Sequence, residues 1–403
     1  MATRSGSILR SILVLLGLLL LVVVGTGFWY RNFIERAMTY PAPADITTPE
    51  WYTPKAKVAG NFKKALPTAD SLTISQTALD KLSDYTQKQH STALLVLHKG
   101  QLVLEKYWGN SHQDQTSNSM SMVKTMMGVL TGMAIEDGKI GSEMDLVADY
   151  IEEWKGDERD KITIQDLLYM QSGLRNEDNG SDPRHDLCWM YAGPNVLKTT
   201  LEIPAIKPAG EIYEYNNANS QMLGIIIERA TGVPIEEYAS EKIWKRIGAK
   251  DAGWWIDRPD GMPKTFCCYF ARARDWARMG KMLMDGGKWE GQQVVPAQWV
   301  KKMLIPSKLE RDYGYQLWLG FEAGGRKDDQ REEMPIAPLF TMDGREKQQV
   351  YMIPSEDLVI VRIGEEPDAW DEGYFPNILL RDLQAQRAEK AATTSTEDLT
   401  QNL

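Results

Sequence analysis

The sequence predicts an α+β protein in which strands from both chain ends form an antiparallel sheet flanked by helices, with a mainly helical lobe inserted between them. Residues 91–109 hold two apolar runs around Lys99-Gly100, a plausible hairpin turn, and residues 348–364 hold two further strand-like runs. The stretches between them have the apolar spacing and glycine stops of helices: 121–140, ITIQDLLYMQSGL, 220–232 and 265–287. Strands on either side of a run of helices favour this architecture.

Length, composition and net charge limit the number of domains and the kinds of partner that the chain can have. The chain has 403 residues, of which 43% are hydrophobic, so it can form one large domain of two lobes or two domains. Its formal net charge of −10 argues against a nucleic-acid partner, which would require a basic face. The sequence gives no indication of oligomeric state.

No cofactor or metal site is predicted. The four histidines are scattered and form no His-Glu-x-x-His or other tight ligand cluster. No Walker loop or dinucleotide-binding fingerprint is present either. The three cysteines fit no zinc motif, and two alternatives stay open for them: a disulfide from Cys188 to Cys267 or Cys268, or three buried thiols.

The N-terminal region predicts a membrane anchor. Residues 12–30 are apolar and uncharged, and at about 1.5 Å per residue they would span about 28 Å, close to the hydrocarbon thickness of a bilayer. Arg4 and Arg10 precede the run, and aromatic residues end it. We therefore expect a single-pass protein of the bacterial inner membrane whose globular domain lies in the periplasm. A cleaved signal peptide and a secreted protein remain the alternative.

Four regions follow from this pattern. Residues 1–30 are the expected anchor or signal segment, and 31–59, rich in Pro and Thr, are an expected extended linker. Residues 60–385 are the expected globular domain. Residues 386–403 have few large apolar groups, so we expect a helix that runs into a disordered tail.

Ser121 and Lys124 are the first candidate catalytic pair. They stand three residues apart at the start of a predicted helix, so both side chains can point into one cleft. A serine hydroxyl needs a base to remove its proton, and a lysine can be that base only if its pKa falls. Burial beside the neighbouring methionines would lower it. A Ser-x-x-Lys pattern alone is weak, but here the surrounding helix is strongly apolar.

Tyr215 and Asn217 are the second candidate pair. A tyrosine can relay a proton to a leaving group when a nearby cation stabilises its phenolate, and Lys124 would be that cation. The Asn217 amide offers both a donor and an acceptor to a substrate carbonyl or amide. A polar turn before a helix is the simpler interpretation of the same residues.

Together these motifs resemble the β-lactamase-like serine hydrolases. SMVK opening a helix, DLLYMQSGL, and PAGEIYEYNNANSQMLGIIIERATG occur in that superfamily's order over roughly residues 60–380. The superfamily includes class C β-lactamases, penicillin-recognising D,D-peptidases, family VIII carboxylesterases and 6-aminohexanoate-oligomer hydrolases, and the 6-aminohexanoate-dimer hydrolase and esterase branch looks closest. The resemblance implies the penicillin-recognising fold, with Ser121 as nucleophile, Lys124 as its lysine, and Tyr215 and Asn217 as the Tyr-x-Asn pair.

The chain departs from the family at its third motif. Where Lys-Thr-Gly or His-x-Gly is expected, the best match is Met342-Asp343-Gly344, which lacks the cation that helps to bind substrate carboxylates. By analogy, Gly344 allows close backbone approach, and the Arg345 N–H joins that of Ser121 in an oxyanion hole. The Arg345 side chain could restore the missing charge. Trp189, in the loop 175–194, is an expected wall of the substrate pocket.

The resemblance implies a serine hydrolase that forms an acyl-enzyme with a small ester or amide, as an esterase, an amidase or a 6-aminohexanoate-oligomer hydrolase does. A D,D-peptidase or β-lactamase acting on cell-wall peptides or β-lactams is one alternative. A membrane-tethered penicillin-binding-type protein with weak or no catalysis is the other. The altered third motif makes carboxylate-bearing substrates less favoured.

Overall fold

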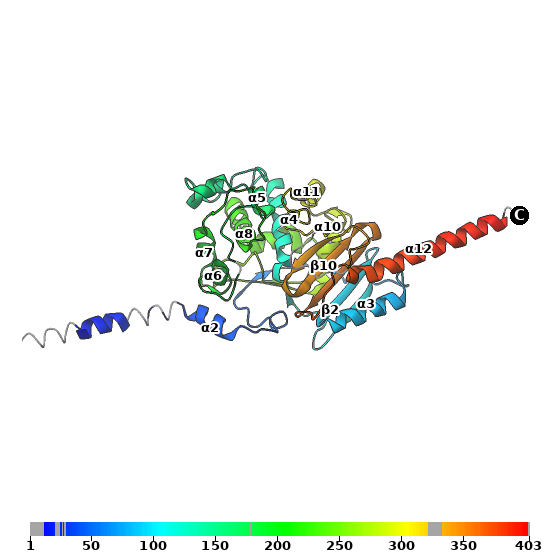
Figure 1. The fold of residues 1–403 in the computed structure, drawn as a ribbon, viewed down its shortest axis with the longest axis horizontal. Helices are drawn as coiled ribbons and strands as arrows, with labels where there is room; N and C mark the ends of the chain where they lie inside the picture. Colours follow the sequence, from blue (N-terminus) through cyan, green and yellow to red (C-terminus); the bar gives the residue numbers. More distant parts are fainter. Residues whose placement is uncertain are drawn as a thin grey trace, which may run out of the picture.

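The computed structural model describes residues 12–20, 25, 27, 30–177, 179–320 and 333–401, with side chains up to residue 394. A five-stranded antiparallel sheet forms one half of the domain and a cluster of helices forms the other (Figure 1). The strand order is β3-β2-β11-β10-β9. The strands are β2 (Ser91–His98), β3 (Gln101–Tyr107), β9 (Phe340–Gly344), β10 (Gln348–Ile353) and β11 (Leu358–Gly364).

The sheet confirms the predicted union of the two chain ends. Strand β11, from the C-terminal part, pairs with β2, from the N-terminal part, from Leu358↔His98 to Ile363↔Ala93. Lys99 and Gly100 form the β2–β3 turn with φ of +53° and +74°. These strands could be predicted from the sequence because each one is apolar and the turns between them are short.

Helices cover both faces of this sheet. On one face, α3 (Gln76–Lys88) and α12 (Tyr374–Gln401) pack against Leu94, Val96 and Ile360. On the other, α10 (Ala273–Met284) lies against β10, β11 and β2. A Cβ on Gly280 would lie 2.6 Å from Val350 Cγ1, so glycine allows this helix to approach the sheet closely. The fold thus places the sheet between two helical layers.

The inserted lobe is mainly helical, as predicted. Its central helix, α4, is buried from Lys124 to Ala134. A Cβ on Gly132 would lie 2.1 Å from Trp299 Cδ1, so glycine lets this indole approach, and Trp299 Nε1 donates to Gly128 O at 2.9 Å. The helices here are α4 (Lys124–Glu136), α5 (Ile164–Leu168), α6 (Asp186–Ala192), α7 (Val196–Glu202), α8 (Asn217–Thr231), α9 (Ile235–Ala239) and α11 (Ala297–Met303). Shorter helical turns are η1 (Met120–Val123), η2 (Val147–Asp149), η3 (Glu152–Trp154), η4 (Glu158–Lys161), η5 (Ser240–Trp244), η6 (Arg345–Lys347) and η7 (Pro354–Glu356).

A second sheet leads the chain into the helical turn that carries Ser121. Its order is β1-β5-β6-β4, and β4 ends one residue before η1 begins. The strands are β1 (Lys55–Val58), β4 (Ser117–Asn118), β5 (Ala252–Trp255) and β6 (Tyr269–Ala271), and a separate hairpin is formed by β7 (Lys288–Trp289) and β8 (Gln292–Gln293). Residues before and after the helical lobe are therefore held side by side near Ser121.

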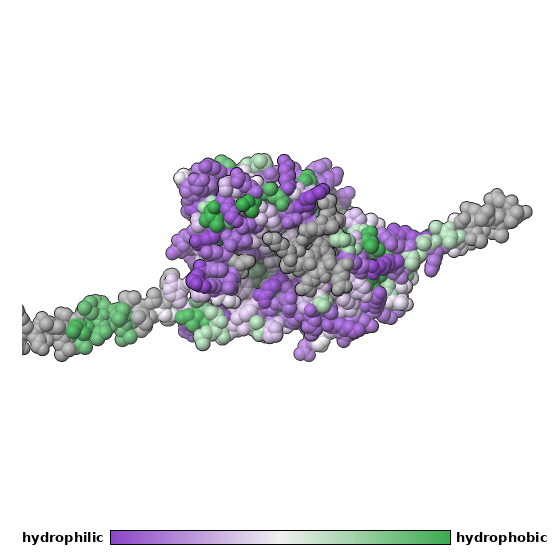
Figure 2. Space-filling view, viewed as in Figure 1, coloured by the Kyte–Doolittle hydropathy of each residue, from purple (hydrophilic) through white to green (hydrophobic). Residues whose placement is uncertain are grey.

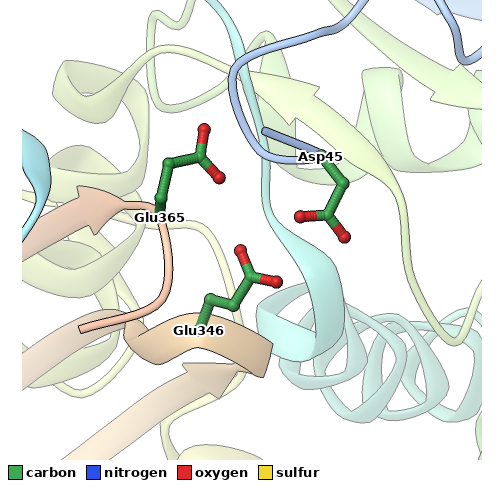
Figure 3. Close-up of side chains that lie close together, drawn as sticks. All are labelled: Asp45, Glu346 and Glu365. Carbon is green, nitrogen blue, oxygen red and sulfur yellow. The ribbon is translucent and has the colours of Figure 1, made fainter. Parts of the chain in front are cut away.

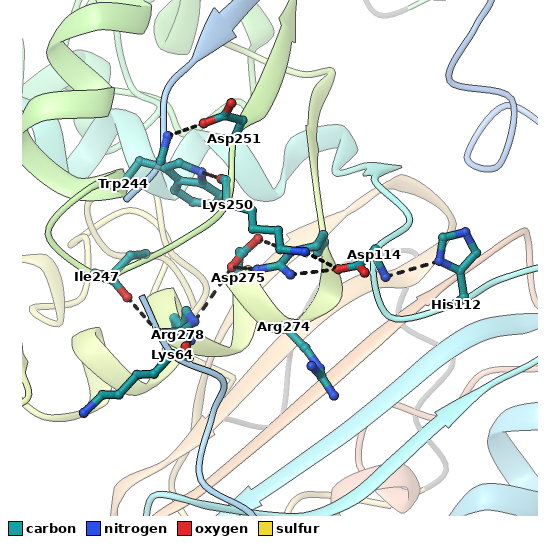
Figure 4. A network of polar contacts seen from close by, with 12 residues as sticks. Lys64, His112, Asp114, Trp244, Ile247, Lys250, Asp251, Arg274, Asp275 and Arg278 are labelled. Atoms are coloured by element: carbon teal, nitrogen blue, oxygen red, sulfur yellow. Dashed lines mark hydrogen bonds and ion pairs between the residues drawn. The ribbon is translucent and has the colours of Figure 1, made fainter. Parts of the chain in front are cut away.

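A buried polar network fixes the start of α10 (Figure 4). Asp275 accepts two hydrogen bonds of 2.7 Å from Arg272, and Arg278 Nε lies 3.8 Å from the same carboxylate. Arg272 also reaches Asp114 at 3.1 Å, where Lys250 binds at 2.7 Å. Burial raises the pKa of Asp275 although its two arginine neighbours oppose the shift. The network ties α10 to the loop that leads to β4.

The region 31–59, expected as an extended linker, contains two regular elements. Helix α2 (Arg31–Thr39) lies beside α6, and strand β1 pairs with β5. The Arg36 side chain is 9% exposed and donates to Asp257 O at 2.8 Å. These contacts come from residues about 150 to 220 positions later in the chain, which local composition cannot show.

The apolar residues 12–20 are exposed and form a green column outside the mostly polar domain surface (Figure 2). Among the described residues, no helix is long and apolar enough to cross a membrane. The predicted run 12–30 falls partly outside the description, since residues 21–24, 26, 28 and 29 are not included. At the other end, α12 continues to Gln401, through the region where we expected a disordered tail.

The cysteines follow neither expected arrangement. Cys267 and Cys268 are bonded to each other, and Cys188 is a buried free thiol. Of the two alternatives that the sequence left open, the buried thiol holds for Cys188 alone, and neither included a bond between adjacent cysteines.

Candidate active site

Ser121 lies in η1, at the junction of the second sheet and α4. The preceding residue, Met120, has a φ of +46°, a conformation that non-glycine residues rarely adopt. Asn118 Oδ1 accepts a hydrogen bond of 3.0 Å from the Met120 N–H, and Ser119 N–H donates to Tyr269 O at 2.9 Å. Such backbone strain persists where the surroundings enforce it, often at functional sites. The turn is thus held from both sides.

Lys124 meets Ser121 as the spacing predicted. Its Nζ lies 2.8 Å from Ser121 Oγ, 2.8 Å from Asn217 Oδ1 and 2.6 Å from Phe266 O. The side chain is only 2% exposed. Helices α4 and α8 therefore bring the two sequence motifs together around one ammonium group.

The environment of Lys124 disfavours its charged form. Burial lowers the pKa of Lys124 to about 7, while Asp343 acts in the opposite direction. A substantial fraction of the lysine is then neutral near pH 7, and a neutral amine can accept the proton of Ser121. This is the state that a general base requires.

Tyr215 lies on the other side of the same lysine. Its ring centroid is 5.1 Å from Lys124 Nζ, and it stacks on Trp318 at 5.6 Å. Tyr313 packs edge-on at 6.1 Å. Trp318 and Tyr313 were not predicted, because they lie about 100 residues later in a segment without a recognisable motif. They hold the Tyr215 ring beside the lysine.

Gly344 lies directly against the turn that carries Ser121. A Cβ at this position would be 2.5 Å from Ser119 O and 3.1 Å from Ser121 N. Only glycine permits this separation without displacing the backbone. The end of β9 is therefore beside the Ser121 backbone, as the predicted oxyanion arrangement requires.

The Arg345 side chain is engaged by acidic neighbours. Its Nη2 lies 3.0 Å from Asp45 Oδ2 and 2.7 Å from Glu346 Oε1, and Nη1 lies 3.3 Å from the Tyr40 hydroxyl. Asp45 and Tyr40 belong to the N-terminal segment. Sequence reasoning missed both residues because nothing in the local pattern relates position 45 to position 345.

A cavity of about 500 Å³ opens onto Ser121. Asn217, Cys267 and Arg345 lie on its surface together with residues of the N-terminal segment and the loop 175–194. Trp189, expected in the wall, is not among the lining residues that are described. Instead it stacks on Phe33, which does line the cavity, with ring centroids 4.4 Å apart.

Three carboxylates are the one group of acids in the described residues that could hold a metal ion. Figure 3 shows Asp45, Glu346 and Glu365 converging. Glu365 already accepts hydrogen bonds from the N–H groups of Ile46 and Thr47, at 3.3 and 3.0 Å. Arg345 supplies positive charge to the other two. Protein donors thus take the place that a cation would fill.

The comparison with known families agrees with this geometry. The beta-lactamase family model matches residues 76–365, which is well over half of the chain. The chain belongs to the beta-lactamase family. The suspected resemblance is confirmed, and so is the predicted α+β fold of this family.

One sequence relative and two solved structures show what this chain is similar to. The 6-aminohexanoate-dimer hydrolase of Paenarthrobacter ureafaciens is 26% identical over 307 residues, covering 72% of this chain and 77% of the relative. A Bacillus anthracis structure assigned to the 6-aminohexanoate-dimer hydrolases superposes with a TM-score of 0.72 at 20% identity, over 88% of this chain and 96% of that one. A family VIII carboxylesterase gives a TM-score of 0.60 at 14% identity, over 78% and 98%. At these identities the two structures show the shared fold alone.

Proposed function

We propose that this member of the beta-lactamase family is a serine hydrolase that acts through an acyl-enzyme on Ser121. The observation that carries the proposal is the 2.8 Å separation between Lys124 Nζ and Ser121 Oγ. Burial lowers the pKa of that lysine to about 7. Lys124 can therefore act as the base that takes the proton of the Ser121 hydroxyl.

The reaction would proceed in two halves. Neutral Lys124 takes the Ser121 hydroxyl proton as Oγ bonds to the acyl carbon, and the N–H groups of Ser121 and Arg345 stabilise the oxyanion. Tyr215 relays a proton to the leaving oxygen or nitrogen as its bond to the acyl carbon breaks. Water then attacks the acyl-enzyme, which releases the acid and returns the proton to Ser121.

The proposed substrates are small esters or amides. The relative from Paenarthrobacter ureafaciens is named for the hydrolysis of an amide dimer, and a structural neighbour is named as a carboxylesterase. Both chemistries fit an acyl-enzyme on Ser121. Met342 is fully buried and carries no charge, so it cannot bind the carboxylate of a β-lactam or a D-alanyl peptide.

A substrate panel tests this function. The soluble domain should hydrolyse p-nitrophenyl butyrate with a higher kcat/KM than nitrocefin or a D-alanyl-D-alanine peptide, and Ser121→Ala should remove all three activities. A tenfold preference for nitrocefin would favour the β-lactamase alternative. Absence of turnover for every substrate would favour a binding protein with little catalysis.

We propose a membrane anchor separately, from the apolar sequence of residues 12–30. The hydrolase domain would then lie on the periplasmic side of a bacterial inner membrane. Fusion of a reporter that is active only in the periplasm after residue 60 tests this topology. A silent periplasmic reporter with an active cytoplasmic one would contradict it.

A further inference from the structure

Residues 33–51, which precede the part of the chain that matches the family model, contribute to the cavity at Ser121. Phe33, Tyr40 and Trp51 all lie on its surface. The Tyr40 and Trp51 rings pack edge-on at 5.4 Å, and Phe33 is supported from behind by Trp189. The segment therefore presents an aromatic wall next to the nucleophile.

The wall is firmly attached to the domain. Besides Asp257 O, Arg36 donates to Ala192 O at 3.3 Å and Thr53 O at 3.2 Å. Further along, Ile46 is fully buried, and the Asn118 N–H donates to its carbonyl at 3.3 Å. Contacts at both ends hold the segment in place.

The same segment also changes the charge at the cavity. Arg345 lines the cavity and its side chain is 56% exposed, so a substrate carboxylate could reach it. Asp45, whose side chain is fully buried, and Glu346 already bind its guanidinium. A carboxylate-bearing substrate would have to compete with both.

We propose that residues 33–51 are a specificity element of the active site, whose aromatic wall binds apolar acyl chains and whose Asp45, together with Glu346, neutralises Arg345 and so disfavours acyl groups that carry a carboxylate. The proposal rests on the proposed function of Ser121. By this account Arg345 does not replace the cation that the third motif lacks.

Asp45 and Glu346 act as a pair. Their carboxylate oxygens lie within 4.8 Å of each other, and Asp45 Oδ1 and Glu346 Oε2 are both buried without a hydrogen-bond partner. Burial and the Asp45 carboxylate raise the pKa of Glu346, while Arg345 lowers it. Glu365 lies within the same cluster, and Arg362 donates to the Glu346 carbonyl oxygen.

It follows that single substitutions have little effect on the charge. Both carboxylates contact the Arg345 guanidinium, so either single variant leaves one acid beside it. Only the double variant Asp45→Asn/Glu346→Gln leaves Arg345 free.

A matched pair of esters tests the charge. The acyl chains of p-nitrophenyl hexanoate and mono-p-nitrophenyl adipate are alike except for the terminal carboxylate. The double variant should raise the adipate-to-hexanoate ratio of kcat/KM by about fivefold or more, the scale of a partly exposed charge-assisted hydrogen bond. Each single variant should change the ratio by less than about twofold. An unchanged ratio in a folded double variant would overturn the charge assignment.

The control removes the same two charges elsewhere. Asp251→Asn/Glu290→Gln breaks two exposed ion pairs, with Lys57 and Lys64, and should leave the ratio unaltered. A ratio that rises equally in the control would also contradict the proposal, because the effect would then come from net charge alone.

The wall is tested independently of the acidic pair, and the test remains available if the double variant does not fold. Phe33→Ala should lower kcat/KM for the hexanoate ester several-fold more than for the acetate ester, since the short chain does not reach the wall. An equal effect on both esters would overturn the proposal that the aromatic wall binds the acyl chain. If native protein hydrolyses neither ester in a Ser121-dependent way, the proposed function itself fails.

Discussion

The Nζ of Lys124 lies 2.6 Å from the carbonyl oxygen of Phe266, which directly precedes the bonded Cys267 and Cys268. The lysine therefore depends on three separate parts of the chain: its own helix, the start of α8 at Asn217, and this turn before β6. An acceptor at each side fixes the amine while the surrounding apolar side chains exclude water. The same buried setting therefore fixes the position of the Lys124 amine and lowers its basicity.

Hydrolysis should depend on pH through Lys124. The active form of the lysine is neutral, and burial lowers its pKa to about 7. We therefore expect kcat/KM for p-nitrophenyl butyrate to be low at pH 5, to rise through about pH 7 and to level off above it. A rate that is constant from pH 5 to 9 would contradict the role of Lys124 as base.

Substitution of the proton-transfer groups should slow turnover without unfolding the domain. Lys124→Ala and Tyr215→Phe should each lower kcat for p-nitrophenyl butyrate by roughly 10²–10⁴-fold, the usual scale for general acid–base groups. The melting temperature of each variant controls for folding. If Tyr215→Phe turned over at the native rate, Tyr215 would have no role in proton transfer, while the role of Lys124 would be unaffected.

Gly344→Ala should reduce kcat more than it reduces stability. The added Cβ would overlap Ser119 O and press on Ser121 N, so it displaces the nucleophile turn relative to β9. Loss of one oxyanion donor typically costs about 10²- to 10³-fold in kcat. Gly138→Ala is a comparison for the general cost of replacing a glycine, because nothing lies within 4 Å of a Cβ there; its φ is +66°, whereas that of Gly344 is −133°. Equal activity of the two variants would argue against the oxyanion role.

The buried network at α10 should contribute to stability. Asp275 is 1% exposed between Arg272 and Arg278, so Asp275→Ala leaves two buried guanidinium groups without their carboxylate. We expect a loss of about 3–5 kcal/mol in the free energy of unfolding by urea denaturation. Asp251→Asn, in an exposed ion pair, should change it by less than about 0.5 kcal/mol. Similar values for the two would show that the network adds little.

The sequence was sufficient for the sheet and for the central catalytic group, because both have local signatures. Strands such as β2 and β11 are short apolar runs between turns, and Ser121 and Lys124 share one helix face. Each of these features could be predicted from a short motif and the residues next to it in the sequence. The resemblance, rather than spacing, placed the Tyr-x-Asn segment in the same site as Lys124, whereas the hydrogen bond from Lys124 to Asn217 was not predicted.

The N-terminal segment could not be predicted in the same way. Its proline and threonine content is typical of a linker, yet Arg36 and Asp45 bind residues far along the chain. The aromatic cluster of Tyr40, Trp51 and Tyr52 was the available signal, since a solvated linker has little use for so many large apolar rings. The same long-range dependence explains why Trp189 was placed in the pocket wall instead of behind it.

Covalent labelling measures the central claim most directly. A fluorophosphonate probe, followed by peptide mass spectrometry, should modify native protein at Ser121 alone. Labelling should be slower by at least about tenfold in Lys124→Ala, since the base that activates the hydroxyl is lost. Labelling at another residue, or an unchanged labelling rate in Ser121→Ala, would contradict the assignment of Ser121 as the nucleophile.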